Sequence, residues 1–407
     1  MQCWNCKEDN DDADECCGAC GESLSAADHA QPAQTATAPP ATVSAVAAAT
    51  VGSRATAQEA PAQPKKPLFP APGRSLFPAP SGPNRPPVVG IQSGCECGAP
   101  ATAIEQDGDG SRICTSCGVK AINPERDDFY IKAADKLLVR SNIGRKHETN
   151  QDYGTAGQLT VAGKPVSWWV VSDGISRAEK SEQASQGACT AADDTIRQAL
   201  ASGRKDAQGI VDRAIRAAQK SVLSIPISPE TLKPDSPLQP PGATIVVALV
   251  MDGTITVGWL GDSRAYLISK QTSGELKAAG ELKISLITRD HSYINYLLDV
   301  EGKSLAEALA TAGKDLHAIT RCLGLLERGV DLEPSFVSLP AEGAVCLLGC
   351  SDGFWNYAHP QQDQPAEKIV ELVKGKLGDP LQMANDMINF ANSCGGVDNI
   401  TVCLLTL

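Results

Sequence analysis

The amino-acid sequence predicts an α+β fold, with antiparallel sheets covered by helices, for the part of the 407-residue chain that follows residue 130. Two observations lead to this prediction. Apolar runs rich in β-forming residues alternate with tight-turn signals, as they do in hairpins. Stretches rich in Ala repeat their apolar residues with helical spacing, and they occur in clusters rather than singly after each strand.

The predicted strands are short apolar runs that end at polar or turn-forming residues. The run SWWVVSD (167–173) is continuously apolar until its last residues, which is typical of a buried strand. TIVVALV (244–250) and TITVGWLG (254–261) flank Asp252 and Gly253, a pair that suits the tight turn of a hairpin. Three further strands are expected at 264–269, 344–350 and 400–407.

The predicted helices lie between and after these strands. Two Ala-rich helices are expected at 178–203 and 206–223, and three more at 292–312, 365–377 and 380–392. The Pro-rich stretch 225–241 is expected to be a surface loop.

Composition limits the classes of function. The net charge of -12 comes without a local basic face, so a nucleic-acid partner is not expected. No apolar run reaches about 18 residues, so no transmembrane helix and no membrane partner are expected. The N-terminus MQCWNCKEDN lacks the features of a signal peptide. We therefore expect a cytoplasmic protein, in which the 15 Cys are metal ligands or buried thiols rather than disulfides.

The first 122 residues divide into three segments. Residues 1–24 and 91–122 are rich in Cys, whereas residues 25–90 are dominated by Ala, Pro, Thr and Gln. The middle segment has too little apolar surface to offset chain entropy, so it is predicted to be a disordered linker. It contains LFPAP twice, at 68–72 and 76–80. These copies are either part of a Pro-rich spacer or a pair of docking motifs for a protein partner.

Both Cys-rich segments have the spacing of structural zinc sites. Two thiolate pairs can supply the four sulfurs of a tetrahedral site, which leaves no open position for catalysis. The first segment resembles a zinc ribbon, and the second does so with a shorter first pair. The first site would use Cys3, Cys6, Cys17 and Cys20, and the second Cys95, Cys97, Cys114 and Cys117. The acidic first ribbon favours a protein partner.

Four carboxylates stand at or beside the ends of predicted buried strands: Asp173, Asp262, Asp352 and Asp398. A buried, isolated carboxylate is costly, but several that converge are tolerated when divalent cations neutralise them. Hard oxygen ligands favour Mg²⁺ or Mn²⁺ over zinc. Two such ions about 4 Å apart can bind a phosphate and lower the pKa of a bridging water. Each Asp taken singly would more simply be a turn residue.

The ordered motifs NQD, SDG, GAT, GDSRAY, ITRDHS, SDG and DNITV resemble those of the PPM family of serine/threonine phosphatases, protein phosphatase type 2C. The resemblance covers residues from about 135 to 407. It implies a central β-sandwich of two antiparallel sheets with helices outside each sheet. It also implies two Mg²⁺ or Mn²⁺ ions, with a third in some members, and in-line attack by the bridging water without a covalent intermediate.

The resemblance also assigns roles to individual residues. Asp173 would bridge both metals, and the carbonyl of Gly174 would ligate one of them. Asp352 and Asp398 would ligate the second metal, and Asp152 would orient a metal-bound water. With Asp352, Asp262 would hold a weaker third metal.

Two departures from the family pattern concern the substrate phosphate. The position of the family's phosphate-binding Arg is occupied by His147, so that His147 or the nearby Arg145 would take over this role. The acidic residue of the same motif is Gln151. Ser176 and Arg177 replace small residues after Asp173 and Gly174, and we expect Arg177 to contact phosphate as a further candidate.

Three functions remain open on the sequence alone. The first is a phosphatase that acts on phosphoserine and phosphothreonine in proteins, with a phosphoprotein substrate and an opposing serine/threonine kinase as partners. The second is a catalytically weak, phosphatase-like binding module, for which the departures at His147, Gln151 and Arg177 leave room. The third is a zinc-ribbon interaction protein. Retention of Asp173, Asp352 and Asp398 favours the enzyme.

Overall fold

The computed structural model describes residues 85–91, 99–106, 112–119, 121–233, 235–270, 282–316, 318–324 and 332–407. The first Cys-rich segment and most of the expected linker lie outside these ranges. Among the described helices, none is long and apolar enough to cross a membrane.

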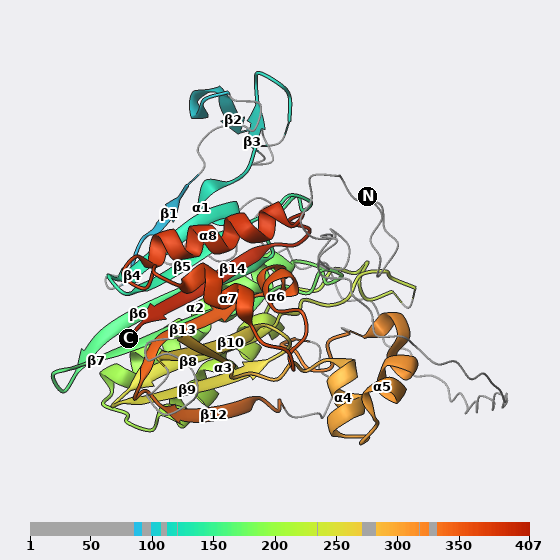
Figure 1. The fold of residues 1–407 in the computed structure, drawn as a ribbon. Coiled ribbons are helices and arrows are strands. Elements are labelled where there is room, and N and C mark those ends of the chain that lie inside the picture. Colours follow the sequence, from blue (N-terminus) through green and yellow to red (C-terminus); the bar gives the residue numbers. More distant parts are fainter. Residues whose placement is uncertain are drawn as a thin grey trace, which may run out of the picture. The chain divides into compact units, whose positions relative to one another are not determined.

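Two antiparallel sheets form the framework (Figure 1). The seven-stranded sheet has the order β1-β4-β5-β14-β13-β10-β11. Its strands are β1 (Val88–Gly90), β4 (Asp128–Ala134), β5 (Leu137–Asn142), β10 (Arg264–Lys270), β11 (Leu282–Leu286), β13 (Ala344–Cys350) and β14 (Ile400–Thr406). The five-stranded sheet has the order β12-β9-β8-β7-β6. Its strands are β6 (Asp152–Val161), β7 (Lys164–Asp173), β8 (Ile245–Met251), β9 (Thr254–Leu260) and β12 (Ser335–Pro340).

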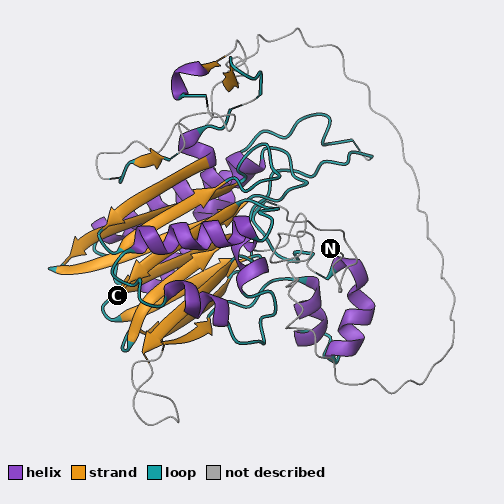
Figure 2. Ribbon diagram, turned by 45° about the horizontal axis from the view of Figure 1, so that its top comes forward, coloured by secondary structure: helices purple, strands orange, loops and turns teal. Residues whose placement is uncertain are grey.

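Helices cover both sheets, as the α+β prediction requires (Figure 2). On the five-stranded sheet, α2 (Ser181–Ala201) contacts β6 and β7, and α3 (Ala207–Leu223) contacts β8 and β9. On the seven-stranded sheet, α6 (Asp352–Ala358), α7 (Glu367–Val373) and α8 (Pro380–Ser393) enclose a separate core. The predicted antiparallel sheets flanked by helices are thus confirmed.

The alternation of side chains along β7 shows how the layers are assembled. Trp168 and Trp169 are both fully buried, but they point to opposite faces of the strand. The indole N–H of Trp168 donates to Asp193 of α2 at 2.7 Å. Trp169 instead packs on Gly349 of the other sheet, where a side chain at position 349 would collide with the indole ring. One strand therefore contributes both to the helix layer and to the core between the sheets.

Local signals set the predicted turns and helix ends. The hairpin of β8 and β9 turns at Asp252 and Gly253, both with positive φ, as expected for its tight turn. The prediction of a single helix at 292–312 is wrong. The structure contains two helices there, α4 (Tyr293–Asp299) and α5 (Leu305–Ala312), separated by a break. Ser304 and Glu307 form a capping box that starts the second helix. A short 3₁₀ helix, η3 (Gly313–Asp315), follows.

The framework begins before the expected boundary at residue 130. Val88–Gly90, within the range assigned to the linker, pairs with β4 as an edge strand. Helix α1 (Pro124–Asp127) leads directly into β4. The second Cys-rich segment contains a 3₁₀ helix, η2 (Ala101–Ala103), and the two-stranded sheet of β2 (Ile104–Gln106) and β3 (Arg112–Cys114).

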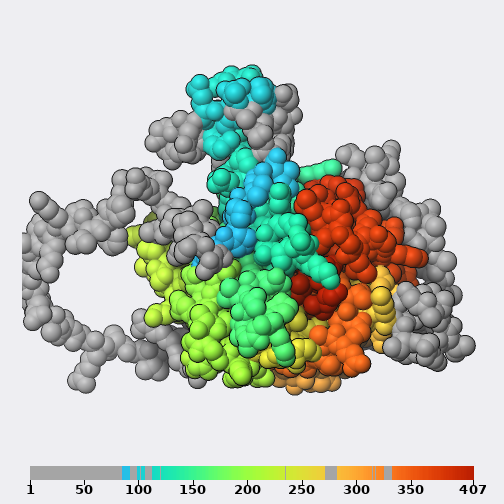
Figure 3. Space-filling view, turned by 90° about the vertical axis from the view of Figure 1, so that its left-hand side faces the viewer, coloured from blue at the N-terminus to red at the C-terminus, as the bar shows by residue number. Residues whose placement is uncertain are grey.

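Segments far apart in the sequence lie side by side in the fold. The C-terminal helix α8 contacts β5, and the last strand β14 pairs with β5 in the centre of the seven-stranded sheet. Figure 3 shows the outcome, with the red residues of the C-terminal region beside the blue-green residues of the first strands. Strand β14 therefore lies in the middle of the sheet, between β5 and β13.

Candidate metal and catalytic site

Four Asp side chains meet at one end of the two sheets. Asp152 begins β6 and Asp173 ends β7, where they occupy opposite positions in the antiparallel register. Asp352 begins α6 immediately after β13, and Asp398 lies two residues before β14. Because β13 and β14 are antiparallel, the end of one lies beside the start of the other. Each sheet therefore supplies two carboxylates.

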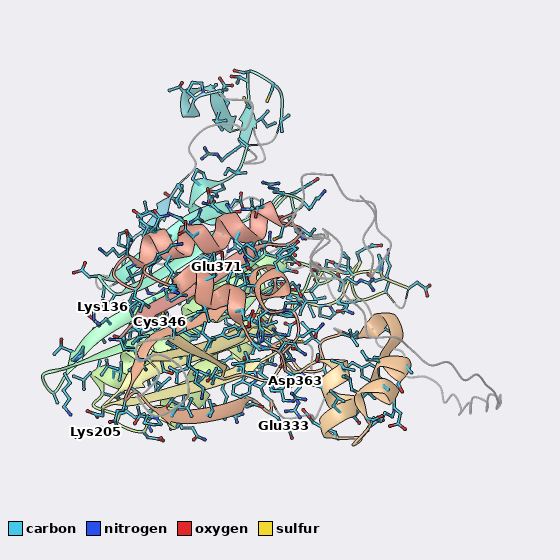
Figure 4. All side chains as sticks on the ribbon, in the orientation of Figure 1. Lys136, Lys205, Glu333, Cys346, Asp363 and Glu371 are labelled. Carbon is cyan, nitrogen blue, oxygen red and sulfur yellow. The ribbon has the colours of Figure 1, made fainter. Side chains whose placement is uncertain are left out.

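The opposite end of the sheets is marked by Lys136, in the turn between β4 and β5 (Figure 4). In the same view Asp363, which follows α6, lies toward the end that carries the carboxylates. The four Asp residues thus occupy one end of the strands, and their location follows from where each strand starts or stops.

Hydrogen bonds between the sheets hold Asp152. The hydroxyl of Ser351, just after β13, donates to Asp152 Oδ2 at 2.6 Å, and the backbone N–H of Thr401 donates to the Ser351 hydroxyl at 3.0 Å. Asn399 Oδ1 accepts from the Gln151 N–H at 2.7 Å, which ties the loop before β14 to the loop before β6. Asp152 therefore has a fixed position between the two sheets.

The GAT motif holds Asp173. The Thr244 hydroxyl accepts from the Asp173 N–H at 3.0 Å, and the Thr244 N–H donates to the Asp173 carbonyl at 2.7 Å. Ser172 donates to the Thr244 carbonyl at 2.6 Å. At Gly174, a Cβ would lie 2.5 Å from the Ser181 carbonyl oxygen, so only glycine fits this approach. The backbone on both sides of Asp173 is thus fixed by the residue before β8 and by the start of α2.

Burial and mutual repulsion disturb the ionisation of these carboxyls. Burial raises the pKa of Asp152 to about 7, and the negative charge of Asp398 adds to this shift. Burial, followed by repulsion from Asp152, Asp352 and Asp398, raises the pKa of Asp173 well above its usual range. Burial and the charge of Asp398 do the same to the pKa of Asp352. A positive charge between them would reverse these shifts.

The oxygen atoms of the site fit a hard divalent cation. Asp152 Oδ1, Asp352 Oδ1 and Asp262 Oδ1 are buried without a hydrogen-bond partner. Within the described ranges, however, no three His, Cys, Asp or Glu side chains already form a complete metal-binding cluster. Mg²⁺ usually binds through one or two carboxylates and keeps several waters, so waters would complete the coordination here.

Asp262 lies at the edge of this group and faces a different partner. Burial raises the pKa of Asp262 to about 7, and repulsion from Asp290 is the next cause, ahead of the charge of Asp398. The carboxyl is 6% exposed. The positive charge of Arg264, which pairs with Asp290, opposes this shift.

The three residues expected to bind phosphate lie in different surroundings. His147 Nε2 is 3.2 Å from Asp398 Oδ1, and this hydrogen bond raises the pKa of His147. Arg145 and Arg177 have exposed side chains. The structure therefore brings His147 to the carboxylates and leaves both arginines at the surface.

Sequence reasoning missed a buried ion pair behind the site. Arg264, from the GDSRAY motif, is 1% exposed and binds Asp290 of ITRDHS through Nε at 3.0 Å and Nη2 at 2.8 Å. Its guanidinium also donates to the His359 carbonyl and lies 3.6 Å from the centre of the Trp355 ring. Both motifs were recognised, but the pairing depends on contacts between strands.

Of the eight predicted zinc ligands, the structure describes two. Cys114 is buried at the end of β3, and Cys117 is exposed in the following turn. The Gly118 N–H donates to the Cys114 carbonyl at 2.8 Å, and Gly118 has a φ of 73°. The other six, Cys3, Cys6, Cys17, Cys20, Cys95 and Cys97, lie outside the described residues.

Comparison with known proteins identifies the family to which this chain is similar. The family model for protein phosphatase 2C matches residues 141–370. The chain is 32% identical over 164 residues to the serine/threonine phosphatase stp of Listeria welshimeri, which covers 40% of this chain and 56% of that protein. It is 29% identical over 167 residues to the protein phosphatase PhpP of Streptococcus pneumoniae, covering 41% and 58%. The chain thus spans little more than half the length of these curated relatives.

A solved structure, that of the Mycobacterium tuberculosis serine/threonine phosphatase PstP/Ppp, is 23% identical with a TM-score of 0.47, covering 67% of this chain and 97% of that one. The family match itself spans more than half of the present chain and includes Asp152, Asp173, Asp262 and Asp352. The chain belongs to the protein phosphatase 2C family.

Proposed function

We propose that this protein hydrolyses phosphoserine and phosphothreonine in other proteins with the help of divalent metal ions. The observation that carries the proposal is the meeting of four carboxyl groups from both sheets, with buried oxygens that lack partners, in a member of the protein phosphatase 2C family. Such a group of carboxylates is stable when cations neutralise it. An opposing serine/threonine kinase would supply the phosphoprotein substrates.

The residues of the chain divide the work of the site. Asp173, the Gly174 carbonyl, Asp352 and Asp398 would hold two Mg²⁺ or Mn²⁺ ions, and Asp262 with Asp352 a third. The ions, when bound, supply positive charge for the phosphate and lower the pKa of water. Asp152 would accept a hydrogen bond from water and so orient it, because its Oδ2 is held by Ser351 while its Oδ1 has no partner.

His147 is the better candidate for contact with the substrate phosphate. It already lies beside Asp398, and the hydrogen bond that raises its pKa favours the protonated, cationic form. Arg145 and Arg177 would reach phosphate only if their exposed side chains turn toward the carboxylates. A single imidazolium makes fewer hydrogen bonds to phosphate than a bidentate guanidinium, so substrate binding is expected to be weak.

The test is Mn²⁺-dependent hydrolysis of para-nitrophenyl phosphate and of a phosphothreonine peptide by the full chain. Asp173→Asn should lose activity, because it removes a carboxylate that would hold the ions. Asp252→Asn, in the exposed turn of the β8–β9 hairpin, is the matched control and should behave as wild type. Equal inactivity of the wild type and Asp173→Asn with metal present would defeat the enzyme proposal.

A phosphatase-like binding module is the second candidate, and it is favoured by His147 in place of the family's Arg. In that case the metal-loaded chain would retain phosphopeptide without turnover. Calorimetry with a phosphothreonine peptide separates the candidates, since the module predicts a stable complex and unchanged peptide by mass spectrometry.

We also propose that the second Cys-rich segment binds a structural zinc ion. The Cys114–Gly118 turn supports this, because two thiolates separated by two residues can bind one metal when the turn is closed by a backbone hydrogen bond. Zinc content of the full chain, measured by mass spectrometry, should fall in Cys117→Ser but not in Cys322→Ser. The same comparison in partner pull-downs tests the role of this segment in protein binding.

A further inference from the structure

Helix α1 lies outside the region that carries the family resemblance. It spans Pro124–Asp127, whereas the family match begins at residue 141 and the sequence placed the start of the domain at 130. Despite this position in the chain, its residues contact the loop that carries Asp152. Helix α1 is therefore in a position to influence the carboxylate group.

Arg126 makes the most direct contacts. Its Nη1 donates to the backbone carbonyl of Asp152 at 2.6 Å. Its Nη2 donates to the Glu182 carbonyl at 3.1 Å and to the Ser185 hydroxyl at 3.3 Å, both in the first turns of α2. The guanidinium carbon lies 5.2 Å from the centre of the Tyr153 ring. One side chain therefore fixes the first residue of β6 against the start of α2.

The backbone and side chain of the neighbouring Asp127 hold the same loop. Asp127 Oδ1 accepts from the Asn150 N–H at 3.2 Å, and its carbonyl accepts from the Ile143 N–H at 2.7 Å. The Asn150 amide donates in turn to the Arg126 carbonyl at 3.2 Å. Helix α1 thus contacts both ends of the loop that connects β5 to β6.

The contact between Arg126 and Asp152 affects the carboxylate group, because Asp152 lies opposite Asp173. Asp152 faces Asp173 directly across the β6–β7 ladder, so a displacement of the Asp152 backbone alters the spacing of two carboxylates. A positive charge at Arg126 also opposes the repulsion within the carboxylate group. Mutation of a residue that hydrogen-bonds to a metal ligand and orients it typically reduces metal affinity or activity by about 10- to 100-fold.

We propose that Arg126 is a positioning residue for the phosphatase reaction: it holds the Asp152 backbone and the start of α2 so that the carboxylates stand at the spacing that two divalent ions require. The inference rests on the proposed function for its catalytic consequence. The effect of Arg126 on metal affinity does not depend on turnover and can be measured without it. It also implies that the active-site scaffold begins before residue 130.

Arg197 offers a matched control for lost packing. Its guanidinium lies 4.9 Å from the centre of the Trp168 ring, and its Nε donates to Asp193 at 2.8 Å within α2. It thus resembles Arg126 in contacting an aromatic ring beneath α2, but its ion pair is with Asp193 of the same helix. Arg197→Met should lower stability without changing the metal site.

The experiment compares full-length wild type, Arg126→Met, Arg126→Lys and Arg197→Met. Isothermal titration calorimetry measures Mn²⁺ affinity, and steady-state kinetics with a phosphothreonine peptide measure kcat and KM. Arg126→Met should weaken Mn²⁺ binding and lower kcat by about 10- to 100-fold, with KM changed little, because the Arg126 guanidinium bonds the backbone carbonyls of Asp152 and Glu182. Arg126→Lys should recover part of both losses, since an ammonium can reach one of the two carbonyls. Arg197→Met should show only a lower Tm.

The proposal is overturned if Arg126→Met retains wild-type Mn²⁺ affinity, or if Arg197→Met loses Mn²⁺ affinity to the same degree. If Arg126→Met does not fold, Mn²⁺ affinity and kcat of Arg126→Lys are compared with those of the wild type instead. Wild-type values of both in Arg126→Lys would then count against the proposal. Failure of the proposed function gives a different result: a wild type that binds Mn²⁺ without turnover, while the effect of Arg126 on Mn²⁺ affinity persists.

Discussion

Asp152 and Asp173 face each other across the antiparallel strands β6 and β7, at the point where one strand starts and the other ends. Like charges directly opposite each other destabilise a sheet, and here burial increases that cost. The arrangement is therefore poor for the stability of the isolated chain and well suited to a cation. The predictions about metal and pH below follow from this pair.

Divalent metal should stabilise the protein. A ligand present at about 100 times its Kd adds about 2.7 kcal/mol to the free energy of unfolding when it binds only the folded state. Mn²⁺ should therefore raise the Tm of the EDTA-treated wild type by several degrees, as measured by differential scanning calorimetry. Asp173→Asn should show little of this rise. An equal rise in both proteins would place the bound metal elsewhere.

Without metal, the protein should lose stability as pH rises. The pKa of Asp152 and of Asp262 is raised to about 7 in the folded state, against about 3.9 in an unfolded chain. Between these values the folded state holds more protons, so the free energy of unfolding falls from pH 4 toward pH 7. Urea unfolding in EDTA at several pH values measures this slope.

Two comparisons test whether these carboxyl groups cause the decline in stability with pH. Asp152→Asn should have a shallower decline with pH, because one of the responsible carboxyls is gone. Saturating Mn²⁺ should remove the decline, since bound cations favour the ionised form. An equal decline in the wild type and in Asp152→Asn would contradict the raised pKa of Asp152, because His291 contributes equally to both proteins.

His291 should cause the opposite effect at acid pH. It is partly buried and lines a pocket of about 490 Å³ at the start of α4, and its burial lowers the pKa of His291 to about 4. Its Nδ1 accepts from the Gly261 N–H at 3.2 Å, and its Nε2 bonds the Ser335 hydroxyl at 2.9 Å, so the neutral ring is the bonded form. This contribution is present above about pH 6.5 and is lost as pH falls toward 4.

His291→Asn provides the measurement, because an amide oxygen can replace Nδ1 as the acceptor and does not titrate. The difference in free energy of unfolding between the wild type and His291→Asn should shrink or reverse on going from pH 7 to pH 4. A difference that stays constant over this range would show that His291 does not titrate with folding.

The buried pair of Arg264 and Asp290 should matter greatly for stability. Arg264→Met removes the cation that faces a carboxylate with a 5% exposed side chain, and breaking such a pair typically costs about 3–5 kcal/mol. Lys233→Met, which breaks the exposed pair with Glu230, should cost no more than about 1 kcal/mol. Urea unfolding measures both, and similar losses in the two variants would contradict the structural role of Arg264.

His147→Arg should improve substrate binding. A guanidinium can bind phosphate through two hydrogen bonds, whereas the imidazolium offers fewer donors and already contacts Asp398. We expect KM for a phosphothreonine peptide to fall about tenfold, which corresponds to about 1.4 kcal/mol. Arg145→Ala and Arg177→Ala should leave KM unchanged. A rise in KM for either alanine variant would instead identify that arginine as the phosphate ligand.

Much of the fold follows from local patterns. The apolar run before Asp173, the turn at Asp252 and Gly253, and the Ala-rich helices were all predictable, because burial and turn geometry leave their marks within a few residues. The break between α4 and α5 was not predicted. There the apolar spacing alone suggested one helix, and the capping box at Ser304 was the overlooked signal.

The sequence by itself determined the class of the fold, the family and the order of the acidic residues at the ends of strands, since each of these is written in short, contiguous motifs. Only the tertiary structure decided that His147 contacts Asp398, that Arg264 pairs with Asp290, and that Arg126 holds Asp152 from outside the matched region. These contacts join residues distant in the chain. They depend on which strands pair across the chain and on how the layers pack, and no local pattern specifies either.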